Sequence, residues 1–136
     1  MIKPIVKDII FLGQKSDPAT PEDKQVITDL LDTLAAHREG CVGLAANMIG
    51  VRKRIIVVNV GFTDMVMVNP FIIAKDSPYQ TEEGCLSLTG LRPTTRYENI
   101  EVQYLDQHFN QYTRKFSGWI AQIIQHEIDH CDGIII

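Results

Sequence analysis

The first half of the chain shows one clear helical pattern. Apolar residues recur at helical spacing from Val26 to Ala35. The segment TPED at residues 20–23 precedes them and combines an N-cap residue, a proline at the first helical position and acidic residues in the first turn. These signals predict a helix that starts near Thr20 and ends at Gly40.

The middle of the chain has the patterns of β-strands. The run RIIVVNV from Arg54 is continuous and rich in β-branched residues, and MVMVNPFIIAKD predicts two short strands that break at Asn69-Pro70. Farther on, IEVQYLD and QYTRKF alternate apolar and polar residues on either side of QHFN. This alternation predicts an antiparallel hairpin with one buried face.

A second helical pattern, GWIAQIIQHEIDHC, begins at Gly118, and Ser117 can cap it. An apolar surface predicts that this helix is buried; its residues are Trp119, Ile120, Ile123, Ile124 and Ile128. Helices on both sides of a strand-rich middle indicate an α+β fold, in which antiparallel strands pack around a C-terminal helix. We expect one domain over residues 1–136, because that length is too short for two.

Composition and charge narrow the class of protein. With 45% hydrophobic and 22% charged residues, and no apolar run long enough to span a bilayer, the chain has the composition of a soluble globular protein. The N-terminal segment lacks the pattern of a signal peptide, so we expect a cytoplasmic protein whose three cysteines are thiols or metal ligands. A net charge of −4 without a basic cluster argues against nucleic acid as a partner.

The last predicted helix carries the sequence HEIDH. His126 and His130 lie one turn apart on the same face of this helix, and Glu127 follows the first of them. Two imidazoles in this arrangement can share one metal ion, and the glutamate can act as a general base on a metal-bound water. The alternative interpretation is a polar stripe on a half-exposed helix.

A hydrolytic metal centre usually has three protein ligands and an open position, so a third ligand is needed. Only CDGIII follows His130, and Cys131 is turned away from the shared face, so this ligand should come from upstream. The candidates are several acidic residues, Cys41, His108 and Cys85. Cys85 is favoured, because Gly84 permits a bulge and a thiolate completes a ligand set suited to Zn²⁺ or Fe²⁺. A lone cysteine can also be a small buried apolar residue.

Three segments of the chain resemble the signature motifs of the peptide deformylases. EGCLS at residues 83–87 and QHEIDH at residues 125–130 resemble two of these motifs. CVGLAANMIG at residues 41–50 is similar to the third, a glycine-rich stretch that ends in GLAA-x-Q. The segments occur in the order and spacing of that family, so the resemblance covers most of the chain.

This resemblance implies a metal-dependent hydrolase that removes the N-formyl group from formylmethionyl peptides and releases formate. Cys85, His126 and His130 would hold the metal, with iron(II) expected and zinc, nickel or cobalt as substitutes. Glu127 would be the acid and base of the reaction. The backbone N–H of Leu86 would stabilise the negative charge of the tetrahedral intermediate.

The resemblance also implies how the substrate is held. The backbone carbonyl of Gly43 would accept the formyl-bearing nitrogen, and Val42, Trp119 and Ile123 would form an apolar pocket for the methionine side chain. The resemblance leaves open whether the protein makes transient contact with nascent chains at the ribosome. The chain ends before the helix that some bacterial members are thought to use there.

Two positions of the glycine-rich motif differ from the family pattern, since its first glycine is Cys41 and its final glutamine is Met48. A thioether cannot donate a hydrogen bond, so one donor to the oxyanion would be missing, and the amide of Asn47 should point elsewhere. One alternative is therefore a related metallohydrolase that acts on another small formyl or amide compound. The other is a metal-binding relative without catalysis, against which the retained Glu127 argues.

Overall fold

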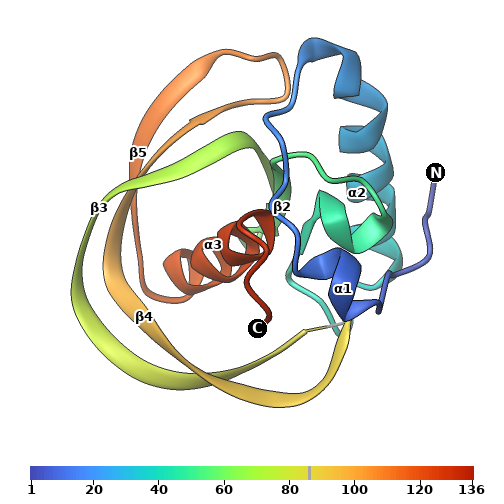
Figure 1. Cartoon of the computed structure of the whole chain (residues 1–136). Coiled ribbons are helices and arrows are strands. Elements are labelled where there is room, and N and C mark those ends of the chain that lie inside the picture. Colours follow the sequence, from blue (N-terminus) through green and yellow to red (C-terminus); the bar gives the residue numbers. More distant parts are fainter. Residues whose placement is uncertain (86) are drawn as a thin grey trace.

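A computed structural model describes residues 1–85 and 87–136 of the chain. Over these residues, a five-stranded antiparallel sheet with the order β1-β2-β3-β4-β5 curves around the last helix, α3 (Figure 1). The strands are β1 (Gly43–Ala45), β2 (Ile55–Asn59), β3 (Asp64–Cys85), β4 (Leu88–Leu105) and β5 (Gln111–Ser117). The helices are α1 (Ile9–Leu12), α2 (Lys24–Ala36) and α3 (Gly118–Cys131), with short 3₁₀ turns η1 (Pro21–Asp23) and η2 (Ala46–Ile49). The predicted α+β fold is confirmed.

The core lies around strand β2. Its residues 55–58 are fully buried, because α2 and α3 both pack against this strand. A strand that is covered on both faces needs apolar side chains at every position, which explains the continuous run IIVV. From α2, Ile27, Leu30 and Leu34 enter the same core.

The prediction of two short strands broken at Asn69-Pro70 is wrong, because β3 runs through this point. The register against β4 shifts between Val68 and Phe71, and Asn69 has a φ of 51°. The side chain of Asn69 accepts the backbone N–H of Ala19 at 2.7 Å and donates to its carbonyl at 3.1 Å. The expected break is therefore a bulge that is fixed to the N-terminal segment.

The predicted hairpin is formed by β4 and β5, but its buried face comes from β4 alone, with Ile100, Val102 and Tyr104, because almost every residue of β5 is exposed. Leu105 pairs with Gln111, and the turn between them closes on the side chain of Asp106, which accepts the N–H groups of His108 at 2.8 Å and Asn110 at 2.9 Å.

The corner between β5 and α3 is sharp. Ser117 occupies the N-cap position of α3 but makes no capping hydrogen bond within the described residues. Gly118 has a φ of 62°, a conformation that glycine adopts without strain, so the chain can pass directly from strand to helix.

The predicted helix begins after Thr20 as the 3₁₀ turn η1, continues from Lys24 as α2 and ends earlier than expected. The side chain of Asp23 accepts the N–H of Thr20 at 2.8 Å in a capping box. The regular helix ends at Ala36, and a turn reaches Gly40, so the predicted end was too late. The single turn of α1 was not predicted, since it is too short to give a periodic pattern.

Candidate active site

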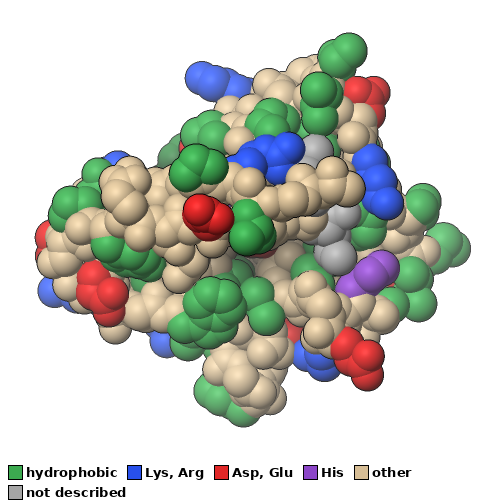
Figure 2. Space-filling view, turned by 90° about the horizontal axis from the view of Figure 1, so that it is seen from below, with side chains coloured by type: hydrophobic (Ala, Val, Ile, Leu, Met, Phe, Trp, Pro, Cys, Tyr) green, Lys and Arg blue, Asp and Glu red, His purple; other side chains and the backbone are tan. Residues whose placement is uncertain are grey.

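A cavity of about 360 Å³ opens between β1, the end of β3 and α3. All five residues predicted to bind substrate line it: Val42, Gly43, Met48, Trp119 and Ile123. The space-filling view shows a hollow in the middle of one face, with hydrophobic side chains gathered around it (Figure 2). This volume lies in the usual range for small-ligand sites.

Two apolar side chains that line this cavity differ in exposure. Ile123 is buried, whereas Trp119 is 61% exposed and stands at the rim. The prediction that Trp119 belongs to the buried face of α3 is therefore wrong. Trp119 is in the first turn of the helix, directly after the corner from β5, where the packing of the sheet against α3 begins.

Cys85, His126 and His130 converge at the inner end of the cavity, where their ligand atoms lie within 4.8 Å of one another. The Nε2 atoms of the two imidazoles are 3.2 Å apart, and the Sγ atom of Cys85 is 3.4 Å from Nε2 of His130. In a tetrahedral site with usual metal–ligand distances, two nitrogens lie about 3.4 Å apart and a sulfur and a nitrogen about 3.6 Å apart. The observed spacings are close to those of a coordination polyhedron, so the group fits one divalent metal ion.

A bulge directs the sulfur of Cys85 toward the two imidazoles. The register between β3 and β4 shifts between Glu83 and Cys85, at Gly84, as the sequence suggested. The Sγ atom also accepts the backbone N–H of Ser87 at 3.4 Å. Leu86, whose N–H was expected to stabilise the oxyanion, lies outside the described residues.

The orientation of His126 is fixed by Glu83. Nδ1 of His126 donates to the carboxylate of Glu83 at 2.8 Å, because an ionised carboxylate can only accept. This bond leaves the lone pair of Nε2 directed toward His130 and available to a metal. The carboxylate also accepts Arg96 through both Nε and Nη2, the latter at 2.7 Å, and Nε2 of Gln122 at 2.9 Å. Arg96 in turn donates to Asp129 at 2.7 Å.

The electrostatics of these groups follow from burial and contact. Burial alone would raise the pKa of Glu83, but hydrogen bonds from His126, Arg96 and Gln122 outweigh it and lower that pKa to about 2. Burial lowers the pKa of His126, yet its hydrogen bonds to Cys85 and Glu83 raise it to about 10 in the metal-free site. Burial and the neighbouring His126 lower the pKa of His130 to about 3. A metal ion held by His126 and His130 would bind to their neutral forms and so displace the proton that raises the charge of this pair.

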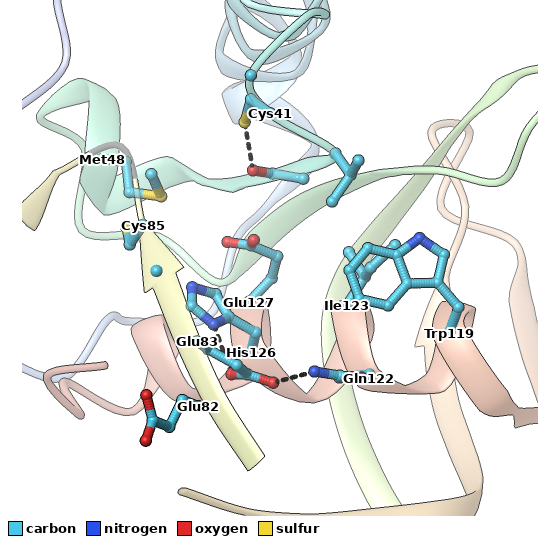
Figure 3. A pocket seen from close by; sticks show the side chains of 14 residues that line it. Cys41, Met48, Glu82, Glu83, Cys85, Trp119, Gln122, Ile123, His126 and Glu127 are labelled. Carbon is cyan, nitrogen blue, oxygen red and sulfur yellow. Dashed lines mark hydrogen bonds and ion pairs between the residues drawn. The ribbon is translucent and has the colours of Figure 1, made fainter. Parts of the chain in front are cut away.

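Glu127 lies between this group and the backbone of β1 (Figure 3). It is 4% exposed, and its Oε1 atom has no hydrogen-bond partner among the residues that the structure describes. A Cβ atom at Gly43 would come within 3.0 Å of Oε2 of Glu127 and 2.9 Å of Ile123, so only glycine permits this close approach. Burial raises the pKa of Glu127 to about 7. A carboxylate with such a pKa can both take and return a proton near neutral pH.

The sequence of the chain is similar to those of known proteins. Residues 3–136 match the sequence profile of a family described as polypeptide deformylase. The chain belongs to the peptide deformylase family. A peptide deformylase of Clostridium beijerinckii is 64% identical over 136 residues, which is 100% of both chains, and one of Pelotomaculum thermopropionicum is 44% identical over 85% of this chain and 76% of its own.

Solved structures of this family have the same fold. A peptide deformylase from Legionella pneumophila superposes with a TM-score of 0.90 at 34% identity, over 99% of this chain and 83% of the other. A Met-Ala-Ser-bound peptide deformylase from Acinetobacter baumannii superposes with a TM-score of 0.87 at 30% identity, over 99% of this chain and 97% of the other. Members of the family are metal-dependent hydrolases that remove the formyl group from peptides, so the prediction of such an enzyme is confirmed.

The residues that differ from the family motif lie on the β1 side of the cavity. Met48 is 1% exposed and lines the cavity at the position of the expected glutamine. Asn47 does not replace that glutamine, because its amide donates to the backbone carbonyl of His130 at 2.9 Å, as its sequence position suggested. Cys41 also lines the cavity, and its sulfur is not part of the Cys85 group.

Four supporting residues were not assigned a role from the sequence: Glu83, Arg96, Gln122 and Asp129. Glu83 and Arg96 form an ion pair in which both side chains are buried. Arg92, not Arg96, stands opposite Glu83 in the ladder, so strand register gives no signal for this pair. Gln122 and Asp129 gave none either, although Gln122 precedes His126 by one helical turn.

In the part of the chain that the structure describes, none of the helices has the length and apolar character needed to cross a membrane.

Proposed function

We propose that this chain cleaves the formamide bond at the N-terminus of formylmethionyl peptides, using a metal held by Cys85, His126 and His130. The observation that carries this proposal is the buried carboxylate of Glu127, whose Oε1 atom lacks a partner within the described part of the chain, beside the three converging ligand atoms. A buried carboxylate without a partner is costly in a purely structural role. In a hydrolase it is the group that exchanges a proton with water and substrate.

The ligand set supports a divalent metal and favours iron(II) or zinc. One thiolate and two neutral imidazoles suit Zn²⁺ and Fe²⁺, and we propose Fe²⁺ as the metal in the cell, with Zn²⁺, Ni²⁺ or Co²⁺ as substitutes. When bound, the metal supplies Lewis acidity, which acidifies a coordinated water and polarises the formyl carbonyl. His126 is held for this purpose by Glu83, whose charge is in turn balanced by Arg96.

Glu127 carries the proton transfers in this proposal. It takes a proton from the attacking water and returns it to the amine that leaves when the C–N bond of the formamide breaks. Its pKa of about 7 places both protonation states within reach at neutral pH. The products are formate and a peptide with a free N-terminal amine.

Substrate contacts come from the β1 side and from the first turns of α3. The carbonyl of Gly43 would accept the N–H of the formylated residue, and the apolar pocket of Val42, Trp119 and Ile123 would take its side chain. The backbone N–H of Leu86 would face the developing negative charge. The natural substrates would be newly made chains, whose formylated N-termini present these groups.

The direct test is formate release from formyl-Met-Ala by protein loaded with Fe²⁺ or Ni²⁺ and kept free of oxygen. We expect turnover by the wild-type protein, and a loss of about 10²–10⁴-fold in kcat for Glu127→Ala with the metal content unchanged. Glu127→Gln, which keeps the size of the side chain, should lose activity to a similar extent. Absence of formate from metal-replete wild-type protein would refute the proposal. Metal analysis of protein purified without oxygen tests the assignment of iron.

A further inference from the structure

The carbonyl of Gly43 points into the cavity and away from the sheet. In the ladder of β1 and β2, Gly43 stands opposite Val58, and the N–H of Asn59 donates to the carbonyl of Val42 at 2.8 Å. Backbone groups of successive residues in a strand point in opposite directions, so the carbonyl of Gly43 faces the free edge of β1. This edge is part of the cavity wall, because Gly43 lines the cavity.

The thiol of Cys41 makes a hydrogen bond to this carbonyl. Its Sγ atom lies 3.0 Å from the oxygen of Gly43 and donates to it, as the dashed line below Cys41 shows (Figure 3). Cys41 is partly buried and lines the same cavity as Gly43 and Glu127. Burial raises the pKa of the Cys41 thiol to about 12, so its proton is present throughout the neutral range. The contact is therefore available in the free enzyme at every working pH.

A second feature of the cavity lies next to this carbonyl. The carboxylate of Glu127 is more than nine-tenths buried, lines the cavity and would lie 3.0 Å from a Cβ atom at Gly43. Its Oε1 atom is without a hydrogen-bond partner in residues 1–85 and 87–136. Two groups thus lie side by side in the cavity. One is the carbonyl of Gly43, which the Cys41 thiol covers, and the other is the carboxylate of Glu127, whose Oε1 atom lacks a partner among the described residues.

We propose that Cys41 sets the affinity for substrate, because its thiol covers the Gly43 carbonyl in the free enzyme and yields it to the N–H of the bound substrate. This inference rests on the proposed function, in which that carbonyl holds the formylated nitrogen. A thiol is a weak donor, so an amide N–H displaces it readily. Before the substrate binds, the thiol shields the carbonyl from water. Its displacement costs little free energy, because the hydrogen bond that is lost is weak. A stronger donor tethered at the same place would compete with the substrate.

Kinetics of two variants test this competition. Serine places an O–H where the thiol stands, and alanine removes the donor with almost the same backbone. We expect KM of Cys41→Ser for formyl-Met-Ala to exceed that of Cys41→Ala by about fivefold, since a neutral hydrogen bond contributes about 1 kcal/mol. The change should appear in KM more than in kcat, because the competing contact exists only before substrate binds. Equal KM values for the two variants would overturn the proposal.

A spectroscopic measurement on the wild-type protein tests the same displacement directly. The S–H stretching band of Cys41 should move to higher frequency when metal-loaded protein is saturated with the tripeptide Met-Ala-Ser, because the thiol loses its acceptor. Cys41→Ala or Cys41→Ser assigns the band, and the S–H band of Cys131, which is 1% exposed and lies in the last turn of α3, is an internal reference. A Cys41 band that stays in place on saturation contradicts the proposal. If no formate is released by any variant, the proposed function fails, and this band still decides the role of Cys41.

Discussion

The two sides of the cavity are formed by different kinds of chemical groups. One side, called the metal side here, consists of Glu83, Cys85, His126, Glu127 and His130. The other is the β1 side described above, called the loop side from here on, and it consists of Cys41, Val42, Gly43 and Met48. On the metal side, buried charged and polar groups bond to one another, and Arg96 and Gln122 complete the network. On the loop side, the groups that face the cavity are a backbone carbonyl, a thiol, a thioether and one apolar side chain.

This difference indicates which side can change. A substitution of Glu83 or Arg96 leaves another buried group without its partner, and a buried charge without a partner is destabilising. On the loop side, Cys41 and Met48 replace the glycine and glutamine of the family motif, and neither breaks a buried ion pair. Under the proposed function, the metal side therefore determines the reaction, and the loop side adjusts how the substrate is held.

The largest effect that sharpens this comparison is expected for Glu83→Gln. The change removes the negative charge between Arg96 and His126, so we expect a loss of about 3–5 kcal/mol in the free energy of unfolding. Metal affinity should fall by about 10–100-fold. Urea unfolding and competition with a chelator measure the two quantities. Glu82→Gln is the matched control, because Glu82 is exposed and should change stability by less than about 0.5 kcal/mol. Similar losses for both variants would contradict the difference between buried and exposed positions.

A gain of function is expected on the loop side. Met48→Gln restores an amide donor to the cavity, and one oxyanion donor contributes about 10²–10³-fold to kcat. We therefore expect kcat of formyl-Met-Ala hydrolysis to rise by up to that factor. Met48→Leu keeps an apolar side chain of similar size and should leave kcat nearly unchanged. If the glutamine variant is no faster than the leucine variant, the site does not use a donor at this position.

A smaller effect is expected at Gln122, which lines the cavity and also donates to Glu83 at 2.9 Å. Gln122→Leu removes this bond while filling a similar volume, so metal affinity should fall by about tenfold. Tyr79→Phe removes only the 3.3 Å bond from the Tyr79 hydroxyl to Gln122 and should leave metal affinity close to that of the wild type. Unchanged affinity in Gln122→Leu would show that this residue does not support the metal side.

The smallest effect is expected at the rim. Trp119→Ala should change the free energy of unfolding by less than about 0.5 kcal/mol, because the side chain is 61% exposed. It should raise KM for formyl-Met-Ala by about fivefold, the equivalent of about 1 kcal/mol of lost apolar contact. Phe62→Ala, at a residue that is 92% exposed and does not line the cavity, is the control and should not change KM. Equal KM values for the two variants would remove Trp119 from the substrate site.

The sequence predicted the groups whose spacing is local. His126, Glu127 and His130 share one helix, and helical geometry alone places the two imidazoles together. It did not predict that β3 continues through the bulge at Asn69, because the contact that fixes this bulge comes from Ala19, 50 residues away. Residues 75–82 of the long hairpin are mostly polar and exposed, so their strand pairing leaves no alternating pattern.

The residues that support the site could not be predicted from the sequence for a similar reason. Glu83 and Arg96 meet only because β3 and β4 curve together beneath α3, and a pair of opposite charges in a sequence is usually exposed. Cys85 could be favoured as a ligand from its glycine neighbour, but its approach to His130 depends on the register shift at the end of β3.

X-ray absorption spectroscopy of the metal-loaded protein tests most directly whether one thiolate and two imidazoles bind a single ion. The account predicts one sulfur at about 2.3 Å and two nitrogens at about 2.0–2.1 Å from the metal, and loss of the sulfur contribution in Cys85→Ser. A wild-type spectrum without sulfur, or a sulfur contribution that persists in Cys85→Ser, would contradict it.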